Sequence, residues 1–372
     1  MAQLSKDEEF RAEVRRFIAD NVPQEIRQRT LMHYHPHKPD VQATTRLLET
    51  RGWSVPSWPV EYGGPGWTTT QRHIFEEECF LSGCPLPSTQ GLHLVGPIIY
   101  TYGSEEQKAR SLPPIRNGDH FWAQGFSEPN AGSDLASLQT RAVRDGDDYI
   151  VNGQKIWTSE AHFSEWVFLL VRTSTEGKKQ AGISFLLAEL STPGITVRPI
   201  IWIDGAHVLN EALLDNVRGP ADNVVGLANM GWTYAKELLA KERVFSSEVP
   251  RAKGLFARLK AVAAATLIRG RPLTDDPHFA KRLAQIEVDL LAQETTLWRV
   301  IAEEEAAIPS AAPTASTLKV CGTELIQRIG ALLVEALGDD ALPAYPQHDY
   351  LLGAPADAPG SSLAPGISAD FF

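Results

Sequence analysis

The chain has 372 residues, more than a single hydrophobic core usually supports, so two or three domains are expected. Hydrophobic residues make up 43% and charged residues 22% of the sequence, which excludes the composition of a disordered chain. The formal net charge of -11 argues against nucleic acid or an anionic membrane surface as the main partner.

The N-terminal residues and the cysteines indicate the compartment. Acidic residues come early and no apolar region follows them, so a secretory signal is not expected. No apolar stretch approaches the roughly 18 residues that a membrane-spanning helix needs. The three cysteines form no C-x-x-C pair, which suits a reducing compartment. We therefore expect a cytoplasmic protein with no membrane span.

The first third of the chain has helical periodicity. Ser5-Lys-Asp-Glu8 matches a capping box, and the apolar residues that follow at three- and four-residue steps predict an amphipathic helix. Residues 41–51 and 70–80 predict further helices, and residues 53–67, rich in Pro, Gly and Trp, predict a packed loop. We therefore expect an N-terminal helical domain over residues 1–120.

After about Phe121 the pattern changes to short apolar runs. Asn152 and Gly153 lie between two such runs, and both central residues of a type I′ turn need positive φ, so this pair predicts a hairpin over residues 148–157. Further strands are expected at residues 166–172, 182–187, 195–203 and 208–214. The sequence therefore predicts a central β domain over residues 121–231.

The helical period returns from Trp232. Helices are expected at residues 233–249, 278–302 and 317–337, ahead of a Pro- and Gly-rich end that begins at Leu342. A C-terminal helical domain is therefore predicted over residues 232–372. The order helical, then β, then helical indicates an α+β fold with segregated elements rather than an alternating one.

Several common catalytic signatures are absent from the sequence. There is no G-x-G-x-x-G after a strand, no G-x-x-x-x-G-K-[ST], no G-x-S-x-G and no H-E-x-x-H, so Rossmann, P-loop, hydrolase and zincin chemistry lose support. His33, His35 and His37 alternate, but no cysteine or carboxylate partners them in a metal-binding pattern. We expect solvated loop histidines and no metal.

Glu242 stands out by its position on a predicted helix. It shares a face with apolar residues at three- and four-residue steps, namely Ala235, Leu238, Leu239, Phe245 and Val249. Glu237 and Lys241 form an i,i+4 pair on the opposite, solvent side. Burial raises the pKa of a carboxyl group toward that of a general base. On the pattern alone, a structural pair with a cation such as Arg243 is the preferred interpretation, and a general base is the alternative.

A second unusual segment opens the predicted β domain. Gln124-Gly-Phe-Ser-Glu-Pro-Asn-Ala-Gly-Ser-Asp134 combines small residues and hydroxyls with turn formers. Such a segment can lay its backbone against a planar ligand, with Ser127 and Ser133 offering hydrogen bonds. On composition alone, an ordinary loop is the preferred interpretation.

These segments resemble motifs of the acyl-CoA dehydrogenase family. The run 124–134 resembles its flavin-binding segment, Asn152-Gly-Gln-Lys-Ile-Trp-Thr-Ser159 resembles its second flavin segment, and residues 231–243 resemble the start of its active-site helix. The similarity covers nearly the whole chain, and two long motifs occur in the right order. Within the family, residues 95–103 and 124–142 look most like the large subunit of pimeloyl-CoA dehydrogenase.

The resemblance implies FAD held between a β domain and a C-terminal four-helix bundle. Carried over by position, the residues at the flavin pyrimidine ring are Gln124, Phe126 and Ser127. Those along the isoalloxazine are Trp157, Thr158 and Ser159, with Ser159 approaching N5. Ser133 then lies near the CoA end of the substrate, Glu242 is the catalytic base, and Arg243 matches an active-site arginine.

The implied reaction is α,β-dehydrogenation of an acyl-CoA. Glu242 removes the α-proton while the β-hydrogen leaves as a hydride to flavin N5, which gives trans-2-enoyl-CoA. Electrons then pass to an electron-transfer flavoprotein, in the degradation of fatty or dicarboxylic acids. Two alternatives are a non-catalytic or FAD-deficient supporting subunit of a heteromeric dehydrogenase, and a flavin-dependent acyl-CoA oxidase.

Two departures from the family bear on assembly. Residues 269–277 lack the R-x-x-F-G element with which many relatives contact the FAD of a neighbouring subunit. The sequence ends at Phe372, where relatives continue into a Y-x-G-T-type segment that adds FAD contacts. We therefore expect a homo- or hetero-oligomer, the latter with a related small subunit that completes the flavin site.

Overall fold

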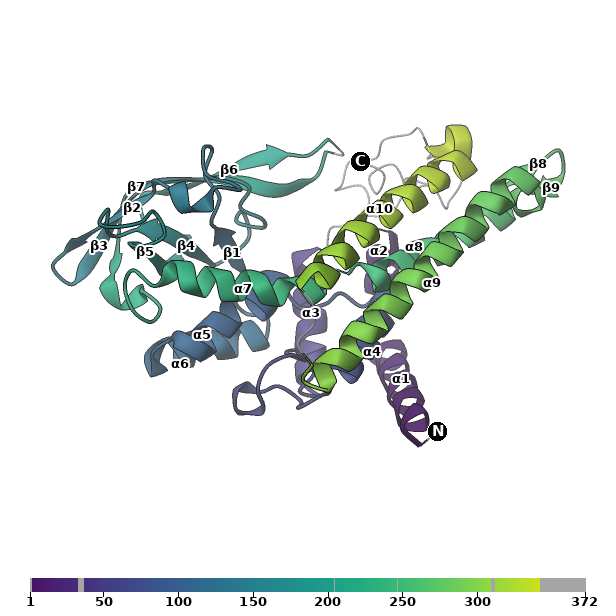
Figure 1. The fold of residues 1–372 in the computed structure, drawn as a ribbon, viewed down its shortest axis with the longest axis horizontal. Helices are drawn as coiled ribbons and strands as arrows, with labels where there is room; N and C mark the ends of the chain where they lie inside the picture. Colours follow the sequence, from purple (N-terminus) through teal and green to yellow (C-terminus); the bar gives the residue numbers. More distant parts are fainter. Residues whose placement is uncertain (1, 33–36, 204, 246, 309–311, 342–372) are drawn as a thin grey trace. The chain divides into compact units, whose positions relative to one another are not determined.

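The structure is a computed structural model that describes residues 2–32, 37–203, 205–245, 247–308 and 312–341. Its described residues form two compact units. Unit 1 comprises described residues within Met1–Asp40, Trp67–Leu86 and Arg243–Phe372. Unit 2 comprises those within Val41–Gly66 and Pro87–Glu242. Helices, then strands, then helices follow one another along the chain, which confirms the predicted α+β fold (Figure 1).

Unit 1 is built from helices. Its elements are α1 (Ala2–Asn21), α2 (Gln24–Met32), α4 (Thr69–Ser82), α8 (Val249–Ala265), α9 (Pro277–Glu305), α10 (Ala312–Leu337) and the short η5 (Leu273–Asp275) and η6 (Gly338–Ala341). The hairpin β8 (Leu267–Ile268) and β9 (Arg271–Pro272) joins α8 to α9 at their common end (Figure 1). Buried residues such as Phe256, Leu290 and Leu333 form the core between α8, α9 and α10.

Acidic residues on α4 are buried within unit 1. Glu78 is 1% exposed and accepts hydrogen bonds from Arg15 Nε at 2.9 Å and Arg11 Nη1 at 2.8 Å. Glu77, also 1% exposed, pairs with Arg11 at 2.5 Å and with Lys253 on α8. These ion pairs supply the charges that buried carboxylates require.

Glu76, the next acid on α4, is expected to destabilise the folded protein at alkaline pH. Burial raises its pKa from 4.5 to about 7, while Arg72 partly opposes the shift. A raised pKa means that the stabilising contribution is complete below about pH 4.5 and is lost as the pH rises through about 7. Glu76→Gln should therefore be more stable than wild type at about pH 8, by about 1–2 kcal/mol, and similar at about pH 5.

Thermal unfolding at the two pH values measures this difference. Glu324→Gln, at an exposed position on α10, is the matched control and should change neither midpoint. Equal gains at both pH values would contradict the assignment, because the effect would then not follow ionisation.

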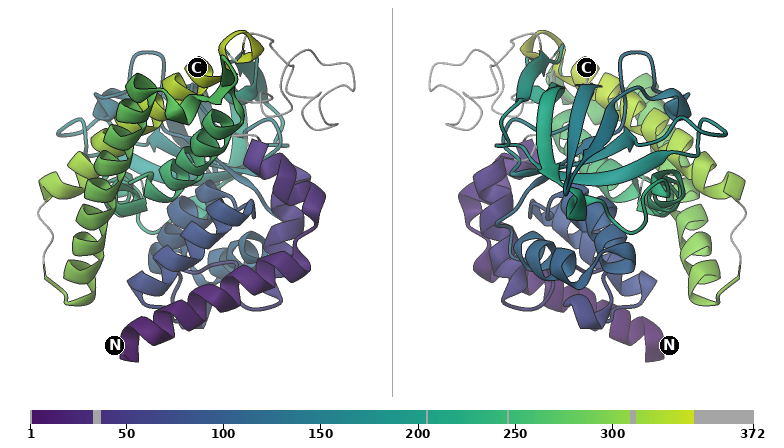
Figure 2. Two further views of the ribbon diagram at one scale, coloured as in Figure 1. Left: turned by 90° about the vertical axis from the view of Figure 1, so that its right-hand side faces the viewer. Right: turned by 90° about the vertical axis from the view of Figure 1, so that its left-hand side faces the viewer.

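Unit 2 combines helices with one sheet. Its helices are α3 (Lys38–Glu49, shared with unit 1), η1 (Val60–Tyr62), the π-helix η2 (Gln90–Val95), α5 (Gly96–Tyr102), α6 (Glu105–Arg116), η3 (Leu135–Ser137), η4 (Ala221–Asn223) and α7 (Gly231–Phe245). The strands are β1 (Trp122–Gly125), β2 (Arg141–Asp145), β3 (Asp148–Lys155), β4 (Trp166–Arg172), β5 (Ile183–Glu189), β6 (Ile195–Ile201) and β7 (His207–Pro220). They form a curled seven-stranded sheet with the order β1-β4-β2-β3-β7-β6, in which β5 pairs with β4 (Figure 2).

Aromatic residues fill the core between this sheet and the helices of unit 2. Trp122, Phe168 and Phe185 are fully buried, and the rings of Phe168 and Phe185 stack with centroids 5.6 Å apart. Each buried ring contributes roughly 2–3 kcal/mol by removal from water. β1 and β4 pair in parallel, so this core fixes the end of β1, where the first predicted flavin segment begins.

The hairpin predicted at Asn152 and Gly153 is wrong. Both residues lie inside the single strand β3. The register shifts there, since Val151 pairs with Val217 and Gly153 with Leu214, so the extra residue of this β-bulge lies on β7. A Cβ at Gly153 would lie 2.4 Å from Thr140 Oγ1, so close packing explains the glycine. The turn occurs earlier, at Gly146, whose φ is 62°.

The helix predicted over residues 233–249 is in fact two helices. α7 ends at Phe245, and Pro250 lies in the first turn of α8, where proline is tolerated because no intrahelical donor is needed. Among the described helices, none combines the length and apolar character that crossing a bilayer requires.

Candidate functional site

The first predicted flavin segment starts at the end of β1. Gln124 and Ser127 are both half-buried there. The ring of Phe126 is 6% exposed and packs on Phe168 and Phe185, with centroids 5.6 and 6.1 Å away. Because this ring fills the core, a ligand beside the segment meets the backbone of Phe126 rather than its side chain.

The second predicted segment follows β3. Trp157 has a φ of 60°, in the left-handed region, and is 56% exposed. Thr158 is fully buried, and its Oγ1 has no hydrogen-bond partner among the described residues. Ser159 is half-buried. An exposed indole next to a buried unpaired hydroxyl suits a planar ligand with polar edges.

The two segments lie side by side. The N–H of Ile156 donates to Ser127 O at 3.0 Å. Lys155 Nζ donates to Phe126 O at 3.1 Å and to Glu128 Oε1 at 2.8 Å. Lys155 is fully buried and Glu128 is 7% exposed, so a buried ion pair joins the strand that carries the second segment to the loop that carries the first.

Glu128 also organises the loop that follows. Its carboxylate accepts the N–H groups of Gln139 at 2.6 Å and Thr140 at 2.9 Å. Burial would raise the pKa of Glu128, but the charge and hydrogen bond of Lys155, with these donors, keep it below its usual value. Burial lowers the pKa of Lys155 to about 8 despite the adjacent carboxylate. The pair is therefore ionised at neutral pH.

Asn210 on β7 holds the second segment from the other side. The N–H of Thr158 donates to Asn210 O at 2.9 Å, and Asn210 Nδ2 donates back to Thr158 O at 3.0 Å. Asn210 Oδ1 lies 2.7 Å from His207 Nε2, and Nδ2 lies 3.3 Å from His162 Nδ1. Asn210 is fully buried, so this network fixes the backbone at Thr158.

The two histidine rings beside Asn210 stack on one another. Their centroids are 3.9 Å apart with an interplanar angle of 23°. Burial and, secondarily, the charge of His207 lower the pKa of His162 to about 4. His162 is therefore neutral at neutral pH, and its Nδ1 can accept the hydrogen bond from Asn210.

Three predicted site residues are not brought to these segments by any described contact. Glu242 and Arg243 belong to the last turn of α7, and their side chains lie outside the described residues. Ser133 is exposed, near the end of the first segment. The proposed roles of all three remain predictions.

The described part of α7 partly follows the predicted faces. Ala235 and Leu238 are buried, as expected, but Leu239 is 38% exposed. Glu237, expected in water, is half-buried and accepts a hydrogen bond from the hydroxyl of Tyr102 on α5. The hydrogen bond from the phenol satisfies this carboxylate away from bulk water, so the prediction for Glu237 is wrong.

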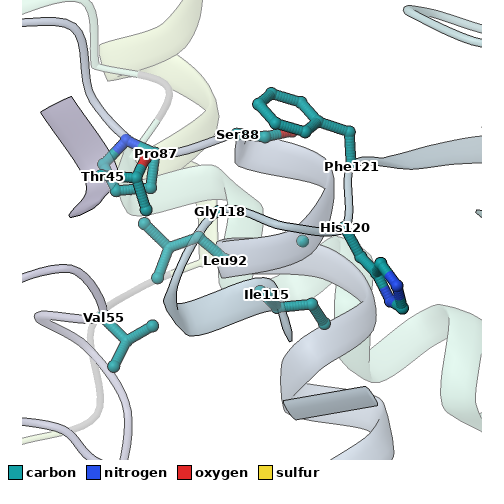
Figure 3. Close-up of a pocket in the computed structure, with 10 residues that line it drawn as sticks. Thr45, Val55, Pro87, Ser88, Leu92, Ile115, Gly118, His120 and Phe121 are labelled. Carbon is teal, nitrogen blue, oxygen red and sulfur yellow. The ribbon is translucent and has the colours of Figure 1, made fainter. Parts of the chain in front are cut away.

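A small cavity lies within unit 2 (Figure 3). It has a volume of about 10 Å³, close to the space that one water molecule needs, and lies between α3, η2, α6 and the start of β1. Its lining residues include Thr45, Ser88, Leu92, Ile115 and Phe121. His120 also lines it, and its Nδ1 is buried without a partner among the described residues. The lining is mainly apolar, with a few polar groups.

Metal binding finds no support in the described residues, since none of them form a group of three or more His, Cys, Asp or Glu placed to hold an ion. His33 and His35 lie outside the described residues. His37 is described, and its Nδ1 lies 3.8 Å from Asp40 Oδ2.

The residues of the two segments fit a flavin. The unpaired Oγ1 of Thr158 offers a hydrogen bond, and the indole of Trp157 offers a flat exposed surface. These features match a planar ring with polar atoms along its edge.

Three family models match consecutive parts of the chain. The acyl-CoA dehydrogenase N-terminal domain matches residues 5–119, the middle domain residues 123–215 and the C-terminal domain residues 229–359. Acyl-CoA dehydrogenase FadE29 of Mycobacterium tuberculosis is 37% identical over 345 residues, which are 92% of this chain and 87% of that protein. Acyl-CoA dehydrogenase IpdE1 of the same organism is 38% identical over 77% of this chain and 75% of its own length.

Solved structures agree with these relatives. The Tcur3481-Tcur3483 steroid ACAD superposes with a TM-score of 0.81 at 29% identity, covering 99% of this chain and 93% of that one. The ChsE4-ChsE5 complex from Mycobacterium tuberculosis gives a TM-score of 0.79 at 31% identity, covering 99% and 92%. The chain belongs to the acyl-CoA dehydrogenase family, and it is an FAD-dependent acyl-CoA dehydrogenase.

Proposed function

We propose that residues 124–127 and 157–159 form the FAD site of this acyl-CoA dehydrogenase. The observation that carries the proposal is the hydrogen bond from Ile156 N–H to Ser127 O, because it sets the two segments side by side. The unpaired hydroxyl of Thr158 adds a donor or acceptor beside them. Six residues are assigned to FAD: Gln124, Phe126, Ser127, Trp157, Thr158 and Ser159.

Glu242 is the proposed catalytic base. Its carboxylate takes the α-proton of the acyl-CoA, which the thioester makes acidic. FAD, when bound, supplies the acceptor for the β-hydrogen, which leaves as a hydride. Arg243, the next residue, is proposed to contact the substrate, and Ser133 is proposed to lie toward its CoA end. Exclusion of water from the site strengthens every charge interaction with the developing enolate.

The proposed substrate is an acyl-CoA whose acyl group carries a ring system. Support comes from the steroid ACAD, which is 29% identical over nearly the whole chain. Pimeloyl-CoA, a linear dicarboxylic thioester implied by the sequence resemblance, is the second candidate.

Electron-transfer flavoprotein is the proposed acceptor of the electrons, and the cytoplasm is the proposed location. We further propose domain boundaries near residues 120 and 231, which the spans of the three family models support.

The purified protein, alone or with its partner, is expected to be yellow and to release FAD on denaturation. Trp157→Ala should weaken FAD binding by roughly tenfold, because loss of an aromatic platform costs about 1–2 kcal/mol. Fluorescence titration of the apoprotein with FAD measures this affinity, and circular dichroism controls for folding. Stoichiometric FMN or a nicotinamide in place of FAD would contradict the cofactor, and unchanged affinity would remove Trp157 from the site.

We expect this chain to work in an oligomer with a related second subunit. The ChsE4-ChsE5 complex, 31% identical to this chain, supports a heteromeric arrangement. Native mass spectrometry and light scattering after co-expression with a candidate partner should show one stable complex that holds FAD. A monomer that is fully flavinylated and active would rule the partner out, and colourless, inactive protein in every combination would favour a supporting subunit. Peroxide release during turnover would favour an oxidase.

A further inference from the structure

Residues 157–160 form a strained turn next to the proposed flavin contacts. Trp157 and Glu160 have φ values of 60° and 62°, a region that side chains other than glycine adopt at a free-energy cost. The N–H of Glu160 donates to Val208 O at 2.8 Å, while Thr158 is held by Asn210. Strand β7 therefore fixes the backbone at Glu160. Backbone strain that the surrounding structure maintains often occurs at functional sites.

The carboxyl group of Glu160 is poorly compensated. Its described hydrogen bond comes from Ser88 Oγ, which lies 3.4 Å from Oε2. Burial raises the pKa of Glu160, and the bond from Ser88 offsets only part of the rise. Among the described residues, no lysine or arginine forms an ion pair with it. Ser88 lines the cavity of Figure 3, so the carboxyl group lies near the wall of that cavity.

Glu160 directly follows Ser159, the residue assigned to flavin N5. Because consecutive Cα atoms are about 3.8 Å apart, the carboxyl group and the side chain of Ser159 belong to the same turn. A carboxylate in the same partly buried turn raises the energy of negative charge added beside it.

We propose that the carboxyl group of Glu160 tunes the reduction potential of the FAD bound beside Ser159. This rests on the proposed function, in which Ser159 lies toward N5. Reduction transfers two electrons and one proton to the flavin as the hydride from the β-carbon, and Glu242 takes the α-proton. The added negative charge favours protonation of the Glu160 carboxylate by a proton from solvent water. Ionised Glu160 lowers the potential, and protonated Glu160 does not.

Other titratable groups lie on the elements around the turn. They are His162 after the turn, His207 on β7, His120 in the cavity wall and Glu165 before β4, which accepts a hydrogen bond from Phe121 N–H at 2.8 Å. Comparison of wild type with variants at position 160 isolates Glu160, because these other groups are present in both.

The test is spectroelectrochemical titration of the FAD-loaded enzyme, in its complex, between about pH 6 and about pH 9. Glu160→Gln should have a more positive potential than wild type at the alkaline end, a smaller difference from wild type toward the acidic end, and a shallower pH dependence. Glu160→Gly should show the same shift without the backbone strain, which keeps the test open if the amide variant folds poorly. Glu176→Gln, an exposed carboxylate in the same unit, is the matched control and should show no shift.

Equal potentials in wild type and both Glu160 variants across the pH range would overturn the inference. Trp157→Phe distinguishes failure of the proposed flavin site from failure of the proposed role of Glu160. If it changes the absorbance of the bound flavin while the Glu160 variants change no potential, the flavin site stands and the role of Glu160 is wrong. If neither position affects the flavin, the proposed site is wrong and the inference falls with it.

Discussion

Replacing Glu242 with glutamine is expected to slow flavin reduction by the acyl-CoA substrate by roughly three to four orders of magnitude. The amide keeps the size and polarity of the side chain but cannot accept the α-proton. Binding of FAD and thioester should stay nearly intact, so the loss falls on the chemical step. Anaerobic single-turnover measurement of flavin bleaching separates that step from binding.

Glu237→Gln is the matched control, since Glu237 lies on the same helix and accepts a hydrogen bond from Tyr102. The amide oxygen can still accept that bond, so bleaching should proceed near the wild-type rate. If Glu242→Gln bleaches the flavin at the wild-type rate, Glu242 is not the catalytic base and instead has a structural role, in an ion pair with a cation such as Arg243.

Glu128→Ala is expected to cost about 3–5 kcal/mol of stability, because it leaves Lys155 buried without a counter-ion. It also removes the acceptor for the N–H groups of Gln139 and Thr140. FAD affinity should fall with it, since the ion pair joins the two proposed flavin segments. Chemical denaturation and FAD titration measure the two effects.

Asp134→Asn provides the comparison for a surface ion pair. Asp134 pairs with Lys179 at 3.0 Å, and both side chains are more than half exposed, so the loss should be at most about 1 kcal/mol. Adding Lys155→Met to Glu128→Ala should recover part of the lost stability, because the unpaired buried charge is then gone. A loss in Glu128→Ala no larger than that of Asp134→Asn would contradict the structural role of the pair.

Most of the fold follows from local patterns in the sequence. Hydrophobic periodicity predicts β4 at Trp166–Arg172 and the helices α3, α4, α9 and α10 to within a few residues. The hairpin prediction is wrong because pairing of the whole strand β3 with β7 outweighs the local turn signal at Asn152 and Gly153. The paired strands accommodate one extra residue on β7 as a bulge. Turn propensity is a local quantity, and strand pairing is not.

Part of the candidate site can likewise be predicted from the sequence, and part of it cannot. The two segments are continuous in sequence, so their small residues and hydroxyls can be seen in it. Asn210 supports the second segment from about fifty residues away, and no local pattern marks that contact. Lys155 did carry a signal, because it alternates with Val151 and Gly153 on one face of β3, and Val151 is buried. A lysine on the buried face of a strand requires a nearby anion, which Glu128 supplies.

Anaerobic mixing of the FAD-loaded enzyme with a panel of acyl-CoA thioesters measures which thioester the enzyme dehydrogenates. The panel contains a steroid-ring acyl-CoA, pimeloyl-CoA and a linear acyl-CoA. The absorbance of the flavin is recorded first, and the mass of each thioester is then measured by mass spectrometry. We expect the ring-containing thioester to bleach the flavin fastest and to lose two hydrogens, which gives an enoyl-CoA. Preferential bleaching by pimeloyl-CoA would replace the proposed substrate and keep the reaction. Unchanged thioesters and unbleached flavin across the panel would contradict acyl-CoA dehydrogenation by this protein.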